Sequence, residues 1–446
     1  MIFLEKLYFI IGPIRIYGTT NFLDTFNELL KDLNFFCHRR DRKINLLRFL
    51  FYTFCGIILF PISTILNWLG YRVVFGTGFN QIGDAVFLDG ALKRQILLRS
   101  SKKLILILGR SEQGNNHLIK KYSKYVKILK WPSFFSIMWS LFSYNPLLRE
   151  DIVNFNSLHT KNRLSKVQRI WSKKKLKPLL SPEKYNNNWN NLPDFLISHF
   201  KARNFVCIHS RDIGFYNNKT LTTRNYDIRT LTDLIQKLTK EGIAVVRIGK
   251  NPEFKINTKN LIKPEYYFDS CNIVSPDQDI FFLSNCIFYI GCSSGPAEVP
   301  GLFGLNCFLI NVYPTVNGKK FVKGDLSIFK KIKNISSNKY INIEKYFAKP
   351  FDLPLQHQDL EKIGYKLENN TSEEIMKAFE EFTYSNRNLY SSLYKKLFDK
   401  INQDQLSILQ SDTYNIDKYF KPYHWTFRSL GMLSKIFVKE YMSKQE

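Results

Sequence analysis

The chain has 446 residues, which is enough for two or three domains. Hydrophobic residues make up 44% and aromatic residues 15%, so a disordered or low-complexity class is excluded. The formal net charge of +27 indicates an anionic partner: nucleic acid, a membrane surface or a small anionic ligand. Because we find no Gly-Phe-rich RNA signature, no Cys/His zinc spacing and no helix-turn-helix pattern, we expect no nucleic-acid partner.

The cysteines indicate a reducing compartment. They are odd in number, none forms a CxxC pair, and several lie within apolar, strand-like runs. We therefore interpret them as small hydrophobic residues rather than as disulfide partners. The seven are Cys37, Cys55, Cys207, Cys271, Cys286, Cys292 and Cys307.

Residues 1–70 are predicted to form a helical, membrane-associated region. A basic cluster at residues 38–43 precedes an uncharged run at residues 49–71 that is long enough to span a bilayer. A full span would keep the basic cluster in the cytoplasm and put the cysteine-containing remainder outside. We therefore expect a hairpin, kinked at Pro61, that dips into the cytoplasmic leaflet. The alternative is a buried helical hairpin in a soluble protein.

Residues 71–193 are predicted to form a first α/β domain. Strands at 71–75, 104–108 and 126–129 alternate with helices at 85–98 and 115–125, a pattern typical of a parallel sheet. Residues 131–192 read as an insertion and a linker. Asp84 follows a Gly-rich loop at a helix start, where its carboxylate is placed to act as a general base on an acceptor hydroxyl. The alternative is a helix cap.

A second α/β domain is predicted over residues 194–345, followed by a helical tail over 346–446. Its strands are expected at 204–208, 243–248, 286–290 and 307–310, and its helices at 227–240, 278–284 and 297–303. In the tail, Thr371 and Glu374 form the pattern of a capping box that opens a helix. We read the tail as packing helices without chemistry of their own.

Residues 284–314 follow the order strand, small-residue turn, short helix, strand. Backbone N–H groups at the start of that helix favour an anion such as a pyrophosphate, and the hydroxyls of Ser293 and Ser294, beside Gly295, can donate to it. Glu298, on the first helical turn, can accept hydrogen bonds from sugar hydroxyls. The alternative is a plain Gly/Ser loop with Glu298 solvated.

Polar residues also crowd the end of the strand at 204–208, and ligands of open α/β sheets bind at such carboxyl ends. Arg211 can bind a phosphate through a bidentate fork, and His209 can donate to phosphate or act as a general base. Asp212 can position Arg211 or bind a hydroxyl. The alternative is a simple ion pair between Arg211 and Asp212. Arg247, at the end of the next strand, meets either phosphate or solvent.

The sequence favours chemistry without a metal ion. No DxD-like pair lies at a predicted strand end, and no His/Glu cluster has metal-ligand spacing. In a phosphate-handling enzyme, cationic side chains and helix dipoles would then replace the metal.

Three segments resemble a family of bacterial glycosyltransferases from surface-polysaccharide gene clusters. They are FVCIHSRDIGFY (205–216), RNYDIRTLTDLIQKLTKEGIAVVRIG (224–249) and DQDIFFLSNCIFYIGCSSGPAEVPGLFGLNCFLIN (277–311). A weaker match is IGDAVFLDGALKRQ (82–95), where the family more often has His after the Gly. Asp84 departs from that pattern, which puts its catalytic role in question.

The resemblance implies two Rossmann-like domains facing a cleft, the arrangement called GT-B. The first domain would bind the acceptor and the second a nucleotide-sugar donor, and no further cofactor is expected. The family's donor site would be lined by Arg211, Ser293, Ser294, Gly295 and Glu298. The resemblance therefore predicts transfer of a sugar to a surface-glycan or lipid-linked acceptor at the cytoplasmic face of the inner membrane. The alternatives are a nucleotide-sugar epimerase-like enzyme and a non-catalytic protein that binds a membrane surface or nucleic acid.

Overall fold

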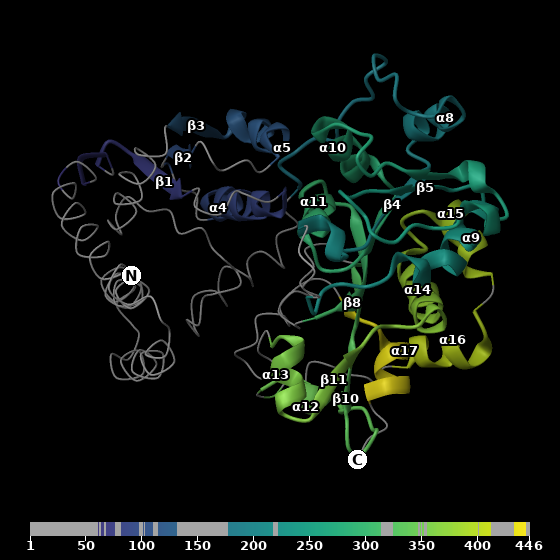
Figure 1. The fold of residues 1–446 in the computed structure, drawn as a ribbon. Coiled ribbons are helices and arrows are strands. Elements are labelled where there is room, and N and C mark those ends of the chain that lie inside the picture. Colours follow the sequence, from purple (N-terminus) through teal and green to yellow (C-terminus); the bar gives the residue numbers. More distant parts are fainter. Residues whose placement is uncertain are drawn as a thin grey trace, which may run out of the picture. The chain divides into compact units, whose positions relative to one another are not determined.

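The structure is a computed structural model in which the chain divides into two compact units, Met1–Leu176 and Lys177–Glu446 (Figure 1). The structure describes residues 68–75, 82–97, 103–109, 115–131, 177–216, 222–313, 324–346, 355–399, 401–411 and 432–442, with isolated positions at 61, 64–66, 101, 348 and 350–351.

The first unit contains a three-stranded parallel sheet in the order β1-β2-β3. The predicted parallel pairing of these strands is confirmed. Its core includes Leu88, Leu106 and Leu118, which are fully buried between sheet and helices. The described elements are β1 (Tyr71–Phe75), η1 (Ile82–Asp84), α4 (Ala85–Leu97), β2 (Lys103–Gly109), α5 (Asn116–Lys120), η2 (Lys121–Lys124) and β3 (Val126–Trp131).

The second unit is built on a seven-stranded sheet in the order β12-β9-β8-β7-β4-β5-β6, and every pair in it is parallel. The fold is thus α/β with a parallel sheet, as the alternating pattern predicts. The strands are β4 (Phe205–His209), β5 (Ala244–Arg247), β6 (Tyr267–Asp269), β7 (Phe288–Gly291), β8 (Asn306–Val312), β9 (Leu326–Phe329) and β12 (Met432–Leu433). A separate antiparallel pair joins β10 (Lys331–Asn334) to β11 (Tyr365–Glu368).

Helices flank this sheet, and Figure 1 shows α9, α14 and α15 grouped beside it. The longer helices are α8 (Asp194–Ala202), α9 (Thr232–Lys240), α10 (Pro276–Asn285), α11 (Gly295–Leu302), α13 (His357–Lys362), α14 (Ser372–Asn386), α15 (Ser391–Phe398) and α16 (Gln403–Gln410). The short ones are η3 (Ile213–Tyr216), η4 (Ile228–Leu231), η5 (Thr258–Asn260), η6 (Pro264–Tyr266), α12 (Ile343–Tyr346), α17 (Lys435–Phe437) and η10 (Val438–Met442).

Two aromatic clusters form the core of this unit. In the first, Phe200 of α8 and Phe282 of α10 meet Phe205 of β4, with ring centroids 5.1–5.8 Å apart. In the second, Phe382 of α14 packs on Phe288 of β7, at 5.3 Å. Each cluster joins a helix layer to the sheet, and buried aromatic rings of this size dominate core energetics.

The predicted tail helices pack on this same sheet. The Thr371–Glu374 capping box at the start of α14 is present, as the sequence predicts. The tail also supplies strands that the sequence analysis did not anticipate, because β12 pairs with β9 across more than 100 residues of chain. The hydroxyl of Ser434, after β12, donates to the buried carboxylate of Glu381 on α14 at 2.6 Å. The end of the described chain is therefore held firmly against the sheet.

No helix in the described part of the chain combines the length and apolar character that crossing a bilayer requires. The uncharged run at residues 49–71 lies largely outside the described residues. The hairpin in the cytoplasmic leaflet therefore stays a prediction.

Candidate functional site

The strand order of the large sheet contains a topological switch point, where successive strands are added on opposite sides of β4. From β4 the chain moves outward through β5 to β6, then crosses back to β7 on the other side of β4 and continues to β8 and β9. Ligands of open α/β sheets bind at the carboxyl ends of the strands beside such a switch point. Here that point lies between β4 and β7, whose last residues, His209 and Gly291, are paired.

The two polar segments singled out in the sequence meet at this point. Residues 209–212 follow β4, and residues 291–295 follow β7 and lead into α11. The Cys292 thiol lies between them, because it contacts the backbone N–H of Arg211 and the hydroxyl of Ser294. The structure thus brings Arg211 and Ser294 to one place on the carboxyl edge of the sheet.

Gly291 is required by the close approach of the two strand ends. A Cβ at this position would lie 2.4 Å from the backbone oxygen of His209 and 2.7 Å from the phenol oxygen of Tyr289. Both distances are shorter than real Cβ contacts, so a side chain here would push β4 and β7 apart. The small residue therefore sets the spacing of the site rather than a turn conformation.

Two buried hydroxyls at the edge lack partners. Ser210 Oγ, after β4, and Ser293 Oγ, after β7, are buried and make no hydrogen bond to any described residue. A buried hydroxyl without a partner is costly, since it has given up its hydrogen bonds to water. Such groups at a switch point are what a ligand with several acceptor oxygens would satisfy.

His209 is a neutral imidazole at this edge. Its Nδ1 lies 3.0 Å from the backbone oxygen of Ile248, which assigns the proton to Nδ1 and leaves Nε2 as an acceptor. Burial lowers the pKa of His209 to about 4, and the nearby charges of Arg247 and Arg211 act in the same direction. The ring is therefore uncharged at neutral pH.

Asp212 organises the loops around the site. Its Oδ1 accepts the backbone N–H of Gly214 and its Oδ2 accepts that of Glu253, both at 3.0 Å. These bonds connect the loop after β4 with the loop after β5. The predicted role of Asp212, to position Arg211 or to bind a hydroxyl, stays a prediction beside these two backbone contacts.

Arg247 forms an ion pair with a residue of the neighbouring strand. Its side chain is only 1% exposed, and its Nη1 lies 3.3 Å from the carboxylate of Asp269, its register partner on β6. Burial is the largest single effect and opposes the charge of Arg247, but Asp269, Cys271 and Tyr267 together outweigh burial, so the pKa of Arg247 is raised. A guanidinium has five N–H donors, so this pairing leaves others to point elsewhere.

The segment Arg224–Asp227 crosses the edge of the sheet. The N–H of Tyr226 donates to the backbone oxygen of Arg211 at 3.0 Å, and its phenol donates to that of His209 at 2.8 Å. Asp227 accepts the N–H of Arg229 at 2.9 Å and caps the start of η4. The resembling segment RNYD therefore holds the end of β4 in place.

Lys330 is a residue of this edge that the sequence analysis missed. It directly follows β9, is 2% exposed, and donates from Nζ to the backbone oxygen of Asn225 at 2.7 Å. The signal in the sequence is a lysine directly after a run at residues 326–329 that is apolar apart from Ser327. That run is only four residues long, so no strand was predicted there.

The other predicted site residues lie at the start of α11 and in the first unit. Gly295 is the first residue of α11, and Glu298 lies on its first turn, partly exposed. Asp84 closes η1 in the first unit, and its side chain lies outside the described residues. Within the described ranges, no group of three His, Cys, Asp or Glu residues could hold a metal ion.

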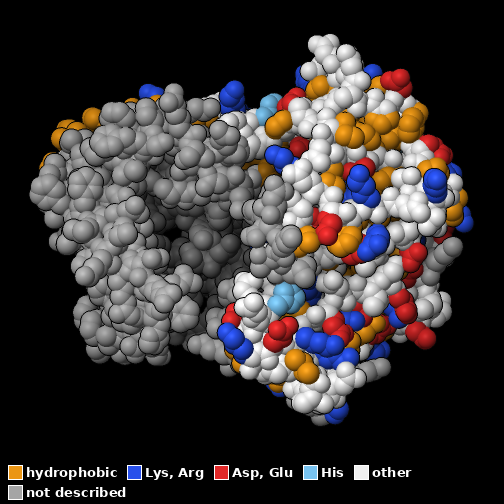
Figure 2. Space-filling model, viewed as in Figure 1, with side chains coloured by type: hydrophobic (Ala, Val, Ile, Leu, Met, Phe, Trp, Pro, Cys, Tyr) orange, Lys and Arg blue, Asp and Glu red, His pale blue; other side chains and the backbone are white. Residues whose placement is uncertain are grey.

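Charges on the visible surface of the second unit are mixed. Figure 2 shows Lys and Arg side chains interspersed with Asp and Glu over the described residues of that face. A continuous basic stripe of the kind that tracks a nucleic-acid backbone is not visible on this face.

Comparisons with known proteins give little beyond this geometry. Neither the protein-family models nor the curated proteins include a match to the chain. Among solved structures, one that matches is the iron-containing dodecameric glycosyltransferase TibC from enterotoxigenic Escherichia coli H10407, with a TM-score of 0.30 and 15% identity. The match covers 54% of this chain and 57% of TibC, so this chain spans just over half the length of that protein. A similarity of this size shows neither a family nor a function for this chain.

Proposed function

We propose that the protein is a glycosyltransferase that uses a nucleotide-sugar donor and binds the donor's diphosphate at the carboxyl edge of the large sheet. The observation that carries this proposal is the meeting of Arg211, Ser293 and Ser294 at the switch point between β4 and β7. The start of α11 adds backbone N–H groups and a favourable dipole.

This arrangement suits the chemistry of the donor. Breaking the bond between the sugar and the diphosphate leaves a new negative charge on the departing phosphate oxygen. The Arg211 guanidinium and the Ser293 hydroxyl are groups that can stabilise that charge as it develops. In this proposal these groups, rather than a metal ion, neutralise the leaving group.

The acceptor hydroxyl must lose a proton during transfer, and two residues are proposed for it. His209 keeps a free acceptor at Nε2, and a bound diphosphate would raise its pKa from about 4 toward the useful range. Asp84, in the first unit, is the second candidate. The acceptor is proposed to be a surface glycan or a lipid-linked glycan at the cytoplasmic face of the inner membrane. Residues 1–70 are proposed to associate with that membrane.

Arg211→Ala tests the proposal. We expect kcat/KM for sugar release from a panel of nucleotide sugars to fall about 100- to 1,000-fold, since the substitution removes charge stabilisation from the transition state. Arg203→Ala, at the exposed end of α8, is the matched control and should keep wild-type activity. Near-wild-type turnover by Arg211→Ala would remove this residue from the mechanism.

The alternative of an epimerase-like enzyme is separated by the products. With the nucleotide sugar alone, a glycosyltransferase releases the nucleoside diphosphate slowly, by hydrolysis. An epimerase returns an isomeric nucleotide sugar with the sugar–phosphate bond intact. Chromatography of the nucleotide pool after incubation therefore distinguishes the two activities.

A further inference from the structure

Lys330 is a buried cation without a counter-charge. Its ammonium group has the backbone oxygen of Asn225 as its hydrogen-bond acceptor, and no carboxylate in the described residues lies within ion-pair distance of it. A buried charge is expensive unless it is paired, because it has lost its solvation. The folded protein carries this cost at the carboxyl edge of the sheet, where the donor diphosphate is proposed to bind.

One peptide group joins Lys330 to the β4 end of the site. The carbonyl of Asn225 accepts the Lys330 ammonium, and the N–H of the same peptide, on Tyr226, donates to the backbone oxygen of Arg211. Since a peptide group is short and planar, Lys330 Nζ and Arg211 O are no more than about 8 Å apart. That separation is comparable to the span of a diphosphate with its hydrogen bonds.

The two cations also act on one atom. Burial raises the pKa of the Cys292 thiol, while the Lys330 ammonium and the Arg211 guanidinium both lower it. Cys292 lies in the loop between β7 and α11, next to the unpartnered hydroxyl of Ser293. The positive charges therefore converge on that loop from both sides, from β4 and from β9.

We infer that Lys330 is a second cationic contact for the diphosphate of the donor, opposite Arg211 across the loop that follows β7. This inference rests on the proposed function, and it names a residue that neither the sequence nor the resemblance assigns. The Asn225 carbonyl holds the ammonium in place. The ligand then supplies the negative charge that the described residues do not.

The electrostatics of Lys330 give this contact a pH dependence. Burial lowers the pKa of Lys330 to about 8. Within the described ranges, the titratable groups that interact with its charge are Cys292 and His357 of α13, and the Lys330 charge adds to burial in lowering the pKa of His357. A diphosphate favours the charged ammonium, so its affinity should be highest below about pH 8 and should fall as the pH rises above that value.

The experiment compares wild type with Lys330→Met, using Lys339→Met in the exposed turn after β10 as the matched control. The probes are UDP, GDP, ADP and inorganic pyrophosphate, with affinity from calorimetry and stability from thermal unfolding. We expect Lys330→Met to bind the preferred diphosphate at least tenfold more weakly at pH 7 and to lose the decline in affinity between pH 7 and 9. Its Tm without ligand should equal or exceed that of wild type, because an uncompensated charge has been removed.

The outcomes separate the two proposals. Binding to wild type that Lys330→Met retains, with the same pH dependence, overturns the inference and leaves the proposed function standing. A lower Tm of Lys330→Met without ligand, together with unchanged diphosphate affinity, would make Lys330 a purely structural residue. Failure of wild type to bind any probe overturns the anion site and the proposed function together. Binding of pyrophosphate alone, lost in Lys330→Met, supports the inference and counts against a nucleotide donor.

Discussion

Two adjacent lysines show how differently this unit treats buried charge. Lys331 is ion-paired with Glu374 and lies over the ring of Tyr340, at 5.2 Å, whereas Lys330 has a carbonyl oxygen as its acceptor. Successive side chains of an extended chain point in opposite directions, so the two lysines enter different surroundings. Glu374 neutralises the buried charge of Lys331. No described carboxylate neutralises the buried charge of Lys330 at the carboxyl edge.

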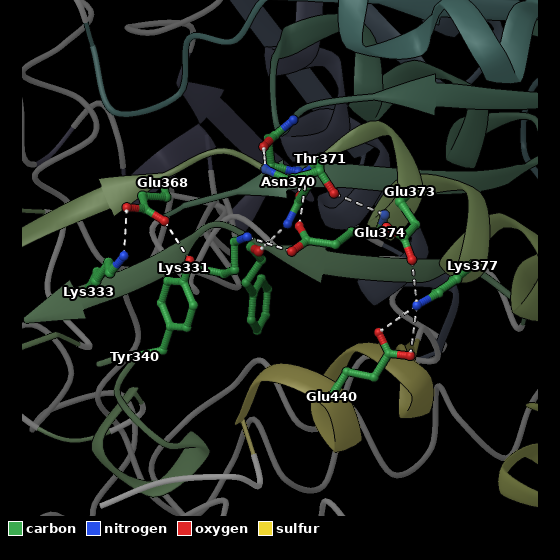
Figure 3. A network of polar contacts seen from close by, with 12 residues as sticks. Lys331, Lys333, Tyr340, Glu368, Asn370, Thr371, Glu373, Glu374, Lys377 and Glu440 are labelled. Atoms are coloured by element: carbon green, nitrogen blue, oxygen red, sulfur yellow. Dashed lines mark hydrogen bonds and ion pairs between the residues drawn. The ribbon is translucent and has the colours of Figure 1, made fainter. Parts of the chain in front are cut away.

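The charged and polar residues around Lys331 form what we call the paired network, which consists of Lys331, Thr371, Glu373, Glu374, Lys377 and Glu440. Figure 3 shows Glu374 also accepting the Thr371 N–H, and Lys377 placed between Glu373 and Glu440. The described charges there have opposite partners at hydrogen-bonding distance. Among the described residues, the carboxyl edge has the reverse character: the Ser210 and Ser293 hydroxyls have no hydrogen-bond partner and the Lys330 ammonium has no carboxylate partner. Stability should therefore depend on the network, and ligand binding on the edge.

The largest expected effect separates the two lysines directly. Lys331→Met leaves the Glu374 carboxylate buried without its cation, which should cost about 3–5 kcal/mol of unfolding free energy. Lys330→Met should cost none. Urea unfolding followed by circular dichroism measures both. Equal losses in the two variants would contradict the comparison.

The next largest expected effect is a pH dependence of the unfolding free energy that arises from His209 at the carboxyl edge. The folded state holds His209 neutral down to about pH 4, while the unfolded chain binds a proton near pH 6.5. The unfolded state therefore binds more protons in that window, and stability falls by up to about 3 kcal/mol as the pH drops through it. Burial raises the pKa of Asp279 to about 7, which acts in the opposite sense over the same range.

Because of this opposition, the quantity to measure is the difference in pH slope between wild type and His209→Gln. We expect the variant to lose less stability than wild type between pH 6.5 and 4, in unfolding titrations at matched ionic strength. His199→Gln controls for the loss of an imidazole elsewhere in the unit. Identical slopes for wild type and His209→Gln would show that His209 is not held neutral.

A smaller effect is expected at the strand ends. Gly291→Ala places a Cβ against the His209 backbone oxygen and forces β4 and β7 apart, at a cost of about 1–3 kcal/mol. Since these ends carry the proposed diphosphate site, donor affinity should fall as well. Gly242→Ala, where the added Cβ meets nothing but the positive φ adds strain, is a control for backbone effects alone. A wild-type affinity in Gly291→Ala would place the ligand elsewhere.

The smallest effect lies in the paired network. Thr371→Ala removes the hydroxyl that caps α14 at the N–H of Glu374, and should cost about 1 kcal/mol. Thermal unfolding measures it, and Ser391→Ala, at the exposed first residue of α15, is its control. A much larger loss would mean that the cap also supports the Lys331–Glu374 pair.

The sequence predicted the fold class and the meeting of the two polar segments, because both rest on local patterns. Alternating strands and helices require parallel pairing, and parallel strands share one carboxyl edge. Three features depended on distant pairing and were not predictable. The partner of Arg247 is Asp269 on β6, a strand of three residues. The loop contact of Asp212 lies 41 positions away at Glu253, and Lys330 follows β9, a strand of four residues.

The position of β12 has a consequence for how the protein is made. Its pairing with β9 needs residues that the ribosome adds more than 100 positions later. Until they emerge, β9 is the bare edge of the nascent sheet and offers its backbone groups to any other extended chain. Synthesis that stops before residue 432 would therefore release a product that is prone to self-association through the unpaired edge of β9, the strand that Lys330 follows.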